Sequence, residues 1–184
     1  MKYYIGIDPG IKGAISVVDS NGDLVECIQL PSEKEESRTG RKISRPDIVG
    51  IINVFDKLRI HYSAPAVVMI EKQVAMPGQN SIGTFNTGKG YGILLALIAV
   101  YFGRAKRDIV DCKEWQQEMI PDRTLVFSKL RRDKRKQLKA DSVATAIKMF
   151  PDAKFKKSAR SRVDNDGMTD SALIAAYCHR KHCR

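Results

Sequence analysis

The first half of this chain limits its fold most, because three strand patterns follow one another before any helix pattern appears. Residues 3–8 and 13–19 are apolar runs rich in β-forming residues, separated by the turn sequence 9–13. A third run, over 23–30, follows the turn 20–22. The chain is therefore predicted to begin with three consecutive strands.

Helix and strand patterns alternate after residue 45. Strands are predicted at 66–70 and 108–111, and helices at 46–62, 87–102, 113–120, 136–149 and 166–182. Residues 66–70 are apolar throughout, which is typical of a strand buried on both faces, whereas the polar segment 32–44 is predicted to be a loop. This order indicates an α/β fold, a mixed five-stranded sheet with helices on both faces. No repeat or domain boundary interrupts residues 1–184, so a single domain is expected.

The charge of the chain predicts a polyanionic partner. Its 184 residues include 32 Lys and Arg against 21 Asp and Glu, a net charge of +11. The longest apolar run, Ile93–Phe102, has ten residues and is too short to span a bilayer. The four cysteines form no disulfide framework, and the first strand begins without a preceding signal peptide. We therefore expect a cytoplasmic protein with no membrane partner.

Two acidic residues lie at the ends of predicted strands. Asp8 ends the first strand, and Glu71 directly follows the apolar run 66–70. An ionised carboxylate at such a place is costly unless a cation neutralises it; otherwise it takes up a proton. A salt bridge to a neighbour such as Lys72 would satisfy Glu71 without any further ligand.

Two more acids, Asp166 and Asp170, open the last predicted helix. Residues four apart lie on one helix face, so both carboxylates can reach one ion. Acids at a helix start are also favoured by the helix dipole alone, with Asp164 or Asn165 as the N-cap, and Asp164 is an alternative to Asp166 as a ligand. Carboxylates of this kind suit Mg²⁺ or Mn²⁺, and two such ions can support phosphodiester hydrolysis by water.

These acids occur in longer characteristic segments: IGIDPGIKGAI contains Asp8, VVMIEKQ contains Glu71 and DGMTDSALIAA contains Asp170. The segment MPGQNSIGTFNTGKGYGIL, the stretch around Trp115 and a Lys-rich helix ending in Phe150 and Pro151 accompany them. In these features, which cover most of its length, the chain resembles the RuvC-type Holliday-junction resolvases of the ribonuclease H-like nucleases. It looks most like short bacteriophage members. Its last two acids are four residues apart, whereas bacterial members commonly have them three apart.

The resemblance implies a ribonuclease H-like fold and a homodimer that nicks paired strands of four-way DNA junctions. It implies that Asp8, Glu71, Asp166 and Asp170 hold two Mg²⁺ ions, for which Mn²⁺ can substitute. Water would be the nucleophile and the nick would carry a 5′-phosphate. Action in the cytoplasm of a phage-infected bacterium follows from the same resemblance. The alternatives are an RNA-processing or RNA–DNA hybrid nuclease on this fold, and a junction-binding protein without catalysis.

A basic segment precedes and enters the predicted helix 136–149. Seven Lys and Arg stand between residues 129 and 139, at 129, 131, 132, 134, 135, 136 and 139, against one acid. Lys136 and Lys139 are expected near the helix N-terminus, where lysines and free amides together would face a phosphate; a solvated charge run is the alternative. The resemblance places a lysine near the scissile phosphate, and Lys136 is the best match. The DNA arms would then follow Arg131, Arg132, Lys134, Lys139 and the basic residues of 154–162.

The loop 73–86 follows Glu71 and is expected to border the site. The resemblance places here the residue that unstacks the junction centre, but Val74 and Ala75 stand where bacterial members have an aromatic. Phe85 either stacks on an exposed base or belongs to the core. Gln79 and Asn80 are candidates for contacts with bases or phosphates.

Two further patterns resemble ligand-binding motifs, but neither is interpreted as a binding site. Residues 83–89 nearly spell a phosphate-binding loop, but Gly90 stands where Ser or Thr is needed and the preceding strand ends too early, so no nucleotide cofactor is expected. The glycines there favour close helix packing and, with Ile93–Phe102, could form the dimer interface that the family implies. Cys178 and His182 have the spacing of zinc ligands one helix turn apart, but a fraying helix end is the preferred interpretation.

Overall fold

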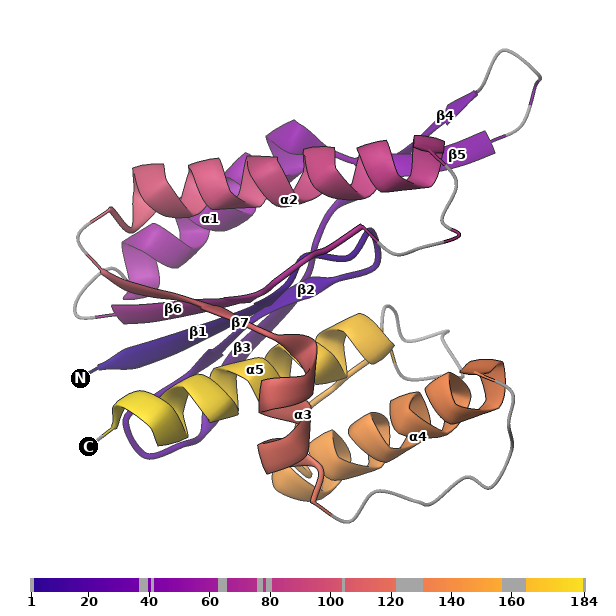
Figure 1. Ribbon diagram of the computed structural model, residues 1–184. Coiled ribbons are helices and arrows are strands. Elements are labelled where there is room, and N and C mark those ends of the chain that lie inside the picture. Colours follow the sequence, from indigo (N-terminus) through magenta and orange to yellow (C-terminus); the bar gives the residue numbers. More distant parts are fainter. Residues whose placement is uncertain are drawn as a thin grey trace.

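Five strands form the central sheet of the computed structural model, which describes residues 2–36, 40, 42–62, 66–75, 78, 81–103, 105–121, 131–156 and 165–183 (Figure 1). The strands are β1 (Tyr3–Asp8), β2 (Ala14–Val18), β3 (Leu24–Gln29), β6 (Ala66–Glu71) and β7 (Lys106–Val110). Their order is β3-β2-β1-β6-β7. The first three pair antiparallel, whereas β6 is parallel to both β1 and β7. The predicted mixed five-stranded sheet is therefore confirmed.

The helices α1 (Ile48–Tyr62) and α2 (Ser81–Tyr101) cover one face of the sheet (Figure 1). Each precedes a parallel strand, because a parallel connection must cross over the sheet and tight turns cannot make it. Phe55 of α1 and Leu94 of α2 are buried here with the side chains of β1 and β6 that point to this face. Parallel strands that are covered on both faces are apolar throughout, which explains the continuous run in β6.

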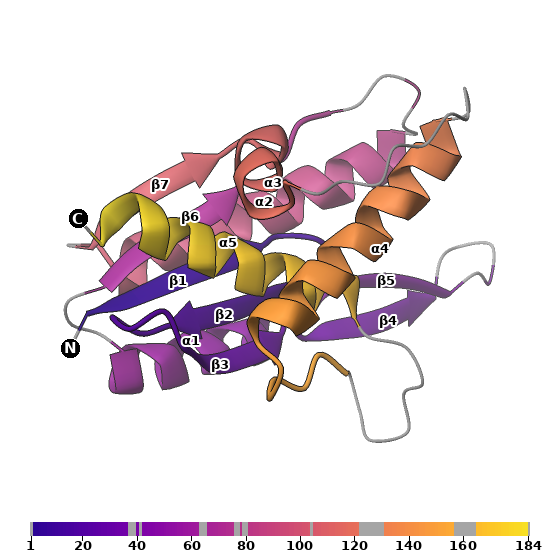
Figure 2. The ribbon, with the colours of Figure 1, turned by 90° about the horizontal axis from the view of Figure 1, so that it is seen from below.

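The opposite face of the sheet is covered mainly by α5 (Asp166–His182), with α3 (Cys112–Met119) and α4 (Arg131–Met149) beside it. Figure 2 shows α5 lying along β1 and β2, with α4 crossing its outer side. All residues of α5 from Gly167 to Cys178 are buried except Asp170, which is partly exposed. This helix is therefore the centre of the second core layer.

Close contact between α5 and β1 depends on Gly6. A Cβ atom at this position would overlap the backbone nitrogen of Ala175 and the carbonyl oxygen of Ser171. Beside this contact, the buried hydroxyls of Ser16 and Ser171 lie 2.7 Å apart and share a hydrogen bond. The small residues let the helix backbone lie directly on the strand.

The predicted loop 32–44 is wrong, because strands β4 (Ser32–Glu36) and β5 (Lys42–Pro46) form a separate two-stranded hairpin there. The segment lacks the apolar alternation that identifies a half-buried strand. Arg45 instead forms cross-strand ion pairs with Glu33 and Glu35. Charged cross-strand pairs stabilise a hairpin that apolar periodicity does not reveal.

Two helices begin earlier than predicted. The helix expected from 87 begins at Ser81 and includes Gly83 and Lys89, so residues 83–89 do not form a phosphate loop. The helix expected from 136 begins at Arg131. Lys and Arg are good helix formers, whereas the prediction followed the apolar spacing and therefore missed a first turn without apolar residues.

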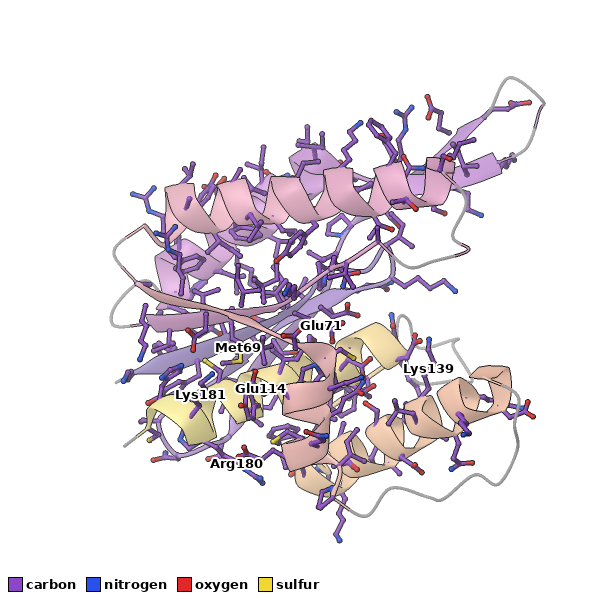
Figure 3. All side chains as sticks on the ribbon, in the orientation of Figure 1. Met69, Glu71, Glu114, Lys139, Arg180 and Lys181 are labelled. Carbon is purple, nitrogen blue, oxygen red and sulfur yellow. The ribbon has the colours of Figure 1, made fainter. Side chains whose placement is uncertain are left out.

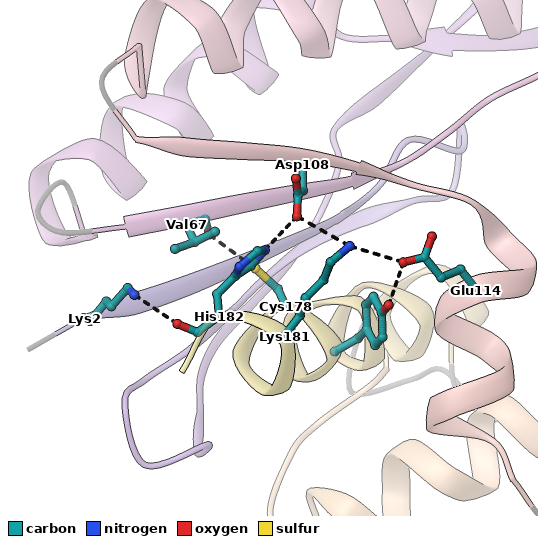
Figure 4. A network of polar contacts seen from close by, with 8 residues as sticks. Lys2, Val67, Asp108, Glu114, Cys178, Lys181 and His182 are labelled. Atoms are coloured by element: carbon teal, nitrogen blue, oxygen red, sulfur yellow. Dashed lines mark hydrogen bonds and ion pairs between the residues drawn. The ribbon is translucent and has the colours of Figure 1, made fainter. Parts of the chain in front are cut away.

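The C-terminal end of α5 is tied to β7 and α3 by a polar network (Figure 4). His182 Nε2 lies 2.7 Å from Asp108 Oδ2, and Lys181 lies 3.2 Å from Glu114. Cys178 is buried and its thiol donates to the carbonyl of Val67. Cys178 and His182 therefore contact two different strands, β6 and β7. No helix in the described ranges is long and apolar enough to cross a bilayer.

Gly6→Ala is expected to lower the free energy of unfolding by about 1–3 kcal/mol or more, because the added methyl group must displace α5. Urea denaturation measures this change. Val49→Ala in α1 is the control: its side chain is 68% exposed, so its truncation should change stability by no more than about 0.5 kcal/mol. A Gly6→Ala protein as stable as the parent would contradict the close contact of α5 and β1.

Candidate active site

Asp8 and Glu71 end neighbouring strands at the same edge of the sheet. Asp8 is the last residue of β1 and Glu71 is the last residue of β6. The two strands are parallel, with Ile7 opposite Ile70, so their carboxyl ends lie side by side. In open α/β sheets, ligands bind at the carboxyl ends of the strands.

The first two turns of α5 bring two more acids to this edge. Asn165 is the N-cap, and its side chain accepts a hydrogen bond of 3.0 Å from the Gly167 amide. A Cβ atom at Gly167 would overlap the carbonyl of Lys12, so the helix begins directly against the turn between β1 and β2. Asp166 and Asp170 consequently face the end of β1. Asp164, the alternative ligand, lies outside the described residues.

All four predicted acids line one cavity of about 460 Å³. Figure 3 shows Glu71 where β6 ends beside α3, and Lys139 on α4 beside the start of α5. The other described residues that line the cavity are Gly10, Ile11, Lys12, Gly13, Gln73, Cys112, Gln116, Leu138, Lys139, Ser142 and Gly167. The end of β1, the end of β6 and the start of α5 are distant in sequence, and the structure brings their acids together in one cavity. Residues of α4 line part of the same cavity.

Each of the four carboxylates has its own hydrogen-bond donor. The Gly10 amide donates to Asp8 Oδ1 at 3.0 Å, and the indole of Trp115 donates to Glu71 Oε2 at 2.8 Å. The Ser142 hydroxyl donates to Asp170, and the Lys139 ammonium group donates to Asp166. Three of these four donors are side chains of α3 and α4.

The site is strongly acidic, and its electrostatics differ between the acids. Desolvation by the surrounding protein raises the pKa of Asp8 to about 7; the Gly10 amide opposes this shift, and the charges of Glu71 and Asp166 add to it. Desolvation likewise raises the pKa of Asp170 to about 7, against the Ser142 hydrogen bond. The pKa of Glu71 is also raised by desolvation, which the Trp115 hydrogen bond opposes. Additional positive charge would therefore stabilise the ionised site.

Asp166 behaves differently. Desolvation raises its pKa, but the hydrogen bond and the charge of Lys139 outweigh this effect, so the pKa of Asp166 is lowered. Lys139 is thus the cation that currently neutralises one acid of the four.

The donor set of the cavity fits a hard divalent cation. Carboxylate oxygens are the ligands that Mg²⁺ and Mn²⁺ prefer. Desolvation, with the charges of Glu71 and Asp170, raises the pKa of the neighbouring Cys112 to about 12, so its thiol is neutral in the metal-free site. Within the described residues, no three His, Cys, Asp or Glu side chains are close enough together to coordinate one ion as they stand. Each acid is instead held by the separate donor described above.

The cavity is lined by Lys139 and not by Lys136, which is exposed on α4. Because α4 begins at Arg131, the two lysines lie in its second and third turns. The expectation that they stand at a helix N-terminus beside free amides is therefore wrong. Lys139 and Ser142 are three residues apart on one helix face, which is why both reach the acids of α5.

Two other predicted DNA contacts, Phe85 and Lys134, do not line the cavity. Phe85 lies on α2 and is 70% exposed, so its assignment to the core is wrong. Lys134 is exposed on α4. Gln79, Asn80 and the side chains of Arg131 and Arg132 lie outside the described part of the structure.

Ser142 and Cys112 were missed in the sequence analysis. Ser142 has a signal in retrospect, because it lies three residues after Lys139 on the same face of the same helix. Cys112 has none, because its place depends on β7 ending beside β6, where the Lys72 amide donates to the Val110 carbonyl at 2.8 Å.

No protein-family model matches the chain, and no curated protein sequence matches it. Two solved structures of RuvC from Thermus thermophilus have the same fold. RuvC in complex with a Holliday junction substrate aligns with 97% of this chain and 95% of its own, at 16% identity and a TM-score of 0.56. A second RuvC structure aligns with the same shares, at 15% identity and a TM-score of 0.51. The fold is therefore the ribonuclease H-like α/β fold of RuvC, as predicted.

Removing the buried charges should stabilise the metal-free protein. Asp8 and Asp170 have a pKa of about 7 in the folded protein, against an ordinary value of 3.8. Because the folded state then holds more protons than the unfolded state, the free energy of unfolding falls as the pH rises from about 4 to 7. In EDTA at pH 8, Asp8→Asn and Asp170→Asn should therefore each raise the free energy of unfolding by more than about 1 kcal/mol, since one pKa unit corresponds to about 1.4 kcal/mol. The gain should vanish near pH 4.

Urea denaturation at pH 8 and pH 4 measures this dependence. Asp166→Asn is the control of opposite sign, because the lowered pKa of Asp166 means that its charge stabilises the fold through Lys139. If Asp8→Asn is less stable than the parent at pH 8 in EDTA, then Asp8 is not a destabilising charge.

Proposed function

We propose that this chain is a metal-dependent endodeoxyribonuclease that resolves four-way DNA junctions. One observation carries the proposal: four carboxylates from three separate elements line one cavity on the RuvC fold, with a basic helix as its wall. The fold alone is compatible with many activities. A solved protein with this fold was determined with a Holliday junction substrate, and this supports the choice of substrate.

Asp8, Glu71, Asp166 and Asp170 would hold the metal, with Mg²⁺ as the ion, two per site, and Mn²⁺ as a substitute. When bound, the metal would supply a water nucleophile at neutral pH and positive charge at the leaving oxygen. The ligands must be deprotonated to bind, and the raised pKa of Asp8 and Asp170 makes this step dependent on pH near neutrality. Hydrolysis breaks the bond between phosphorus and the 3′-oxygen and leaves the phosphate on the 5′ end.

Lys139 would have two partners during the cycle. In the metal-free site it donates to Asp166. Once Asp166 serves as a metal ligand, the ammonium group is free to contact an oxygen of the scissile phosphate. In this proposal Lys139 takes the role that the sequence analysis gave to Lys136, because Lys139 lines the cavity.

The DNA would run along the basic half of α4. Lys134 and Lys136 are exposed there, with Arg131 and Arg132 in the same turns of the helix. Phosphate contacts of this kind release counterions and make binding steeply dependent on salt. Phe85, with 70% of its surface exposed, would supply the stacking surface for an unpaired base, and Gln79 and Asn80 would contact the DNA beside it.

The active form would be a homodimer of single-domain subunits, because two symmetric cuts require two sites related by a two-fold axis. The outer face of α2 supports this assembly. Ile82 and Val100 are 71% and 75% exposed there, and Cβ atoms at Gly88 and Gly92 would meet nothing within 4 Å, so another helix can approach closely. We place the activity in the cytoplasm, including that of a phage-infected bacterium, on the sequence resemblance.

Cleavage of a labelled four-way junction, in parallel with linear duplex and RNA–DNA hybrid, tests this function. Reactions contain Mg²⁺, Mn²⁺ or EDTA. Symmetric, metal-dependent nicks confined to the junction are expected. Faster cutting of the hybrid would make the protein a different nuclease on the same carboxylates, and tight junction binding without any cleavage would make it a binding protein.

Asp8→Asn is expected to retain junction binding and to lose cleavage, because the side chain keeps its shape and its acceptor for Gly10 but loses its charge. Electrophoretic mobility shifts and single-turnover cleavage measure the two properties separately. Equal loss of binding and cleavage would contradict the assignment of Asp8 as a metal ligand.

Lys139→Met should mainly lower the rate of cleavage, whereas Lys136→Met should mainly weaken DNA binding. Loss of Lys139 should lower the single-turnover rate by about 10²-fold, the usual effect of removing one group that stabilises the charge of a transition state. Loss of Lys136 should mainly weaken junction binding. It should also reduce the slope of the logarithm of the binding constant against the logarithm of the salt concentration by about one. The reverse pattern would return the catalytic role to Lys136.

A further inference from the structure

Trp115 is a core residue that also contacts the candidate site. Its side chain is 0% exposed and belongs to the core layer on the α5 face of the sheet. Its indole nitrogen nevertheless donates to Glu71 Oε2 at 2.8 Å. A buried tryptophan needs an acceptor for its N–H group, and here that acceptor is one of the four acids of the cavity.

The position of this donor is fixed by the backbone. The Lys72 amide donates to the Val110 carbonyl at 2.8 Å, which joins the end of β6 to the end of β7. The helix α3 begins two residues after Val110, and Trp115 lies in its first turn. The pairing of β6 with β7 and the first turn of α3 therefore place the indole next to Glu71.

Glu71 needs such a constraint more than the other acids do. A glutamate side chain has three rotatable bonds, and fixing it costs about 1.5–2 kcal/mol of conformational entropy. The Trp115 hydrogen bond engages Oε2, the Cys112 thiol is a second hydrogen-bond partner of this carboxylate, and Glu71 lines the cavity. A neutral donor holds the carboxylate without cancelling its charge, in contrast to the way that Lys139 neutralises Asp166.

We propose that Trp115 is a positioning residue that orients Glu71 for binding of a divalent metal ion. The inference rests on the proposed function, since it takes Glu71 to be a metal ligand. Hydrogen-bond partners of metal ligands typically change metal affinity by 10–100-fold when they are removed. Trp115 acts through Glu71 and does not touch the substrate or the metal.

Trp115→Phe keeps an aromatic ring in the core and removes the N–H donor. The dissociation constant for Mn²⁺, measured without DNA from the electron paramagnetic resonance signal of free Mn²⁺, should rise about 10-fold or more. Tyr177→Phe is the matched control. It removes the 2.7 Å hydrogen bond between Tyr177 and Glu114, which also anchors α3 to α5 but lies away from the cavity, so its Mn²⁺ affinity should equal that of the parent.

A double-mutant cycle separates positioning from a general disturbance of the core. In a Glu71→Gln background, Trp115→Phe should cause no further loss of Mn²⁺ affinity, because the oriented charge is already gone. Equal affinity of Trp115→Phe and the parent protein, or the same loss in both backgrounds, would overturn the proposal. If the parent binds no Mn²⁺ at all, then the metal centre of the proposed function fails, and this inference fails with it.

The parent protein gives an independent measurement that does not require Trp115→Phe to fold. Trp115 is the sole tryptophan of the chain, so its fluorescence reports on this one position. Mg²⁺ added to the protein without DNA should change the emission along the same saturation curve as calorimetric binding. Glu71→Gln should abolish this change. Calorimetric binding of Mg²⁺ with unchanged emission would overturn the proposal.

Discussion

The direct contact between α5 and β1 is the constraint on which the rest of this structure depends. Because position 6 is glycine, the helix backbone lies on the strand without an intervening side chain. That contact fixes the height of the helix over the sheet, and the fit of Gly167 against Lys12 fixes where the helix begins. Asp166 and Asp170 then reach the end of β1, where Asp8 stands. The candidate site is thus a consequence of core packing, because no flexible loop among the described residues is needed to bring these acids together.

This arrangement has an electrostatic cost that the neighbouring helices reduce. Four carboxylates in one cavity repel one another, and desolvation adds to the penalty for Asp8 and Asp170, as their raised pKa values indicate. Donors from α3 and α4 offset part of this cost. A buried acid that serves no ligand would be replaced at a gain in stability. The presence of three acids with raised pKa values in one cavity, Asp8, Glu71 and Asp170, is what favours a bound cation there.

The sequence predicted the sheet well, and it indicated which acids meet at one edge of it, because both depend on short-range patterns. Asp8 and Glu71 could be recognised because each ends an apolar strand, and parallel neighbours must end at the same edge of the sheet. The hairpin β4–β5 could not be recognised in this way, because Arg45 and its acidic partners stabilise it in place of an apolar face. Likewise, the choice between Lys136 and Lys139 depends on how α4 crosses α5, and no local pattern specifies the angle between two helices.

The two halves of the basic helix α4 lie in different surroundings. Its C-terminal half is part of the core through Ala146, whereas its N-terminal half is rich in Lys and Arg, of which Lys134 and Lys136 are exposed. Lys139 and Ser142 lie between the two halves and donate to the acids of α5. Under the proposed function, a phosphate bound beside Lys134 and Lys136 would attract the ammonium group of Lys139 away from Asp166, which would then be available to hold a metal ion. Substrate binding and completion of the metal site would then favour each other, because both require Lys139 to leave the same carboxylate.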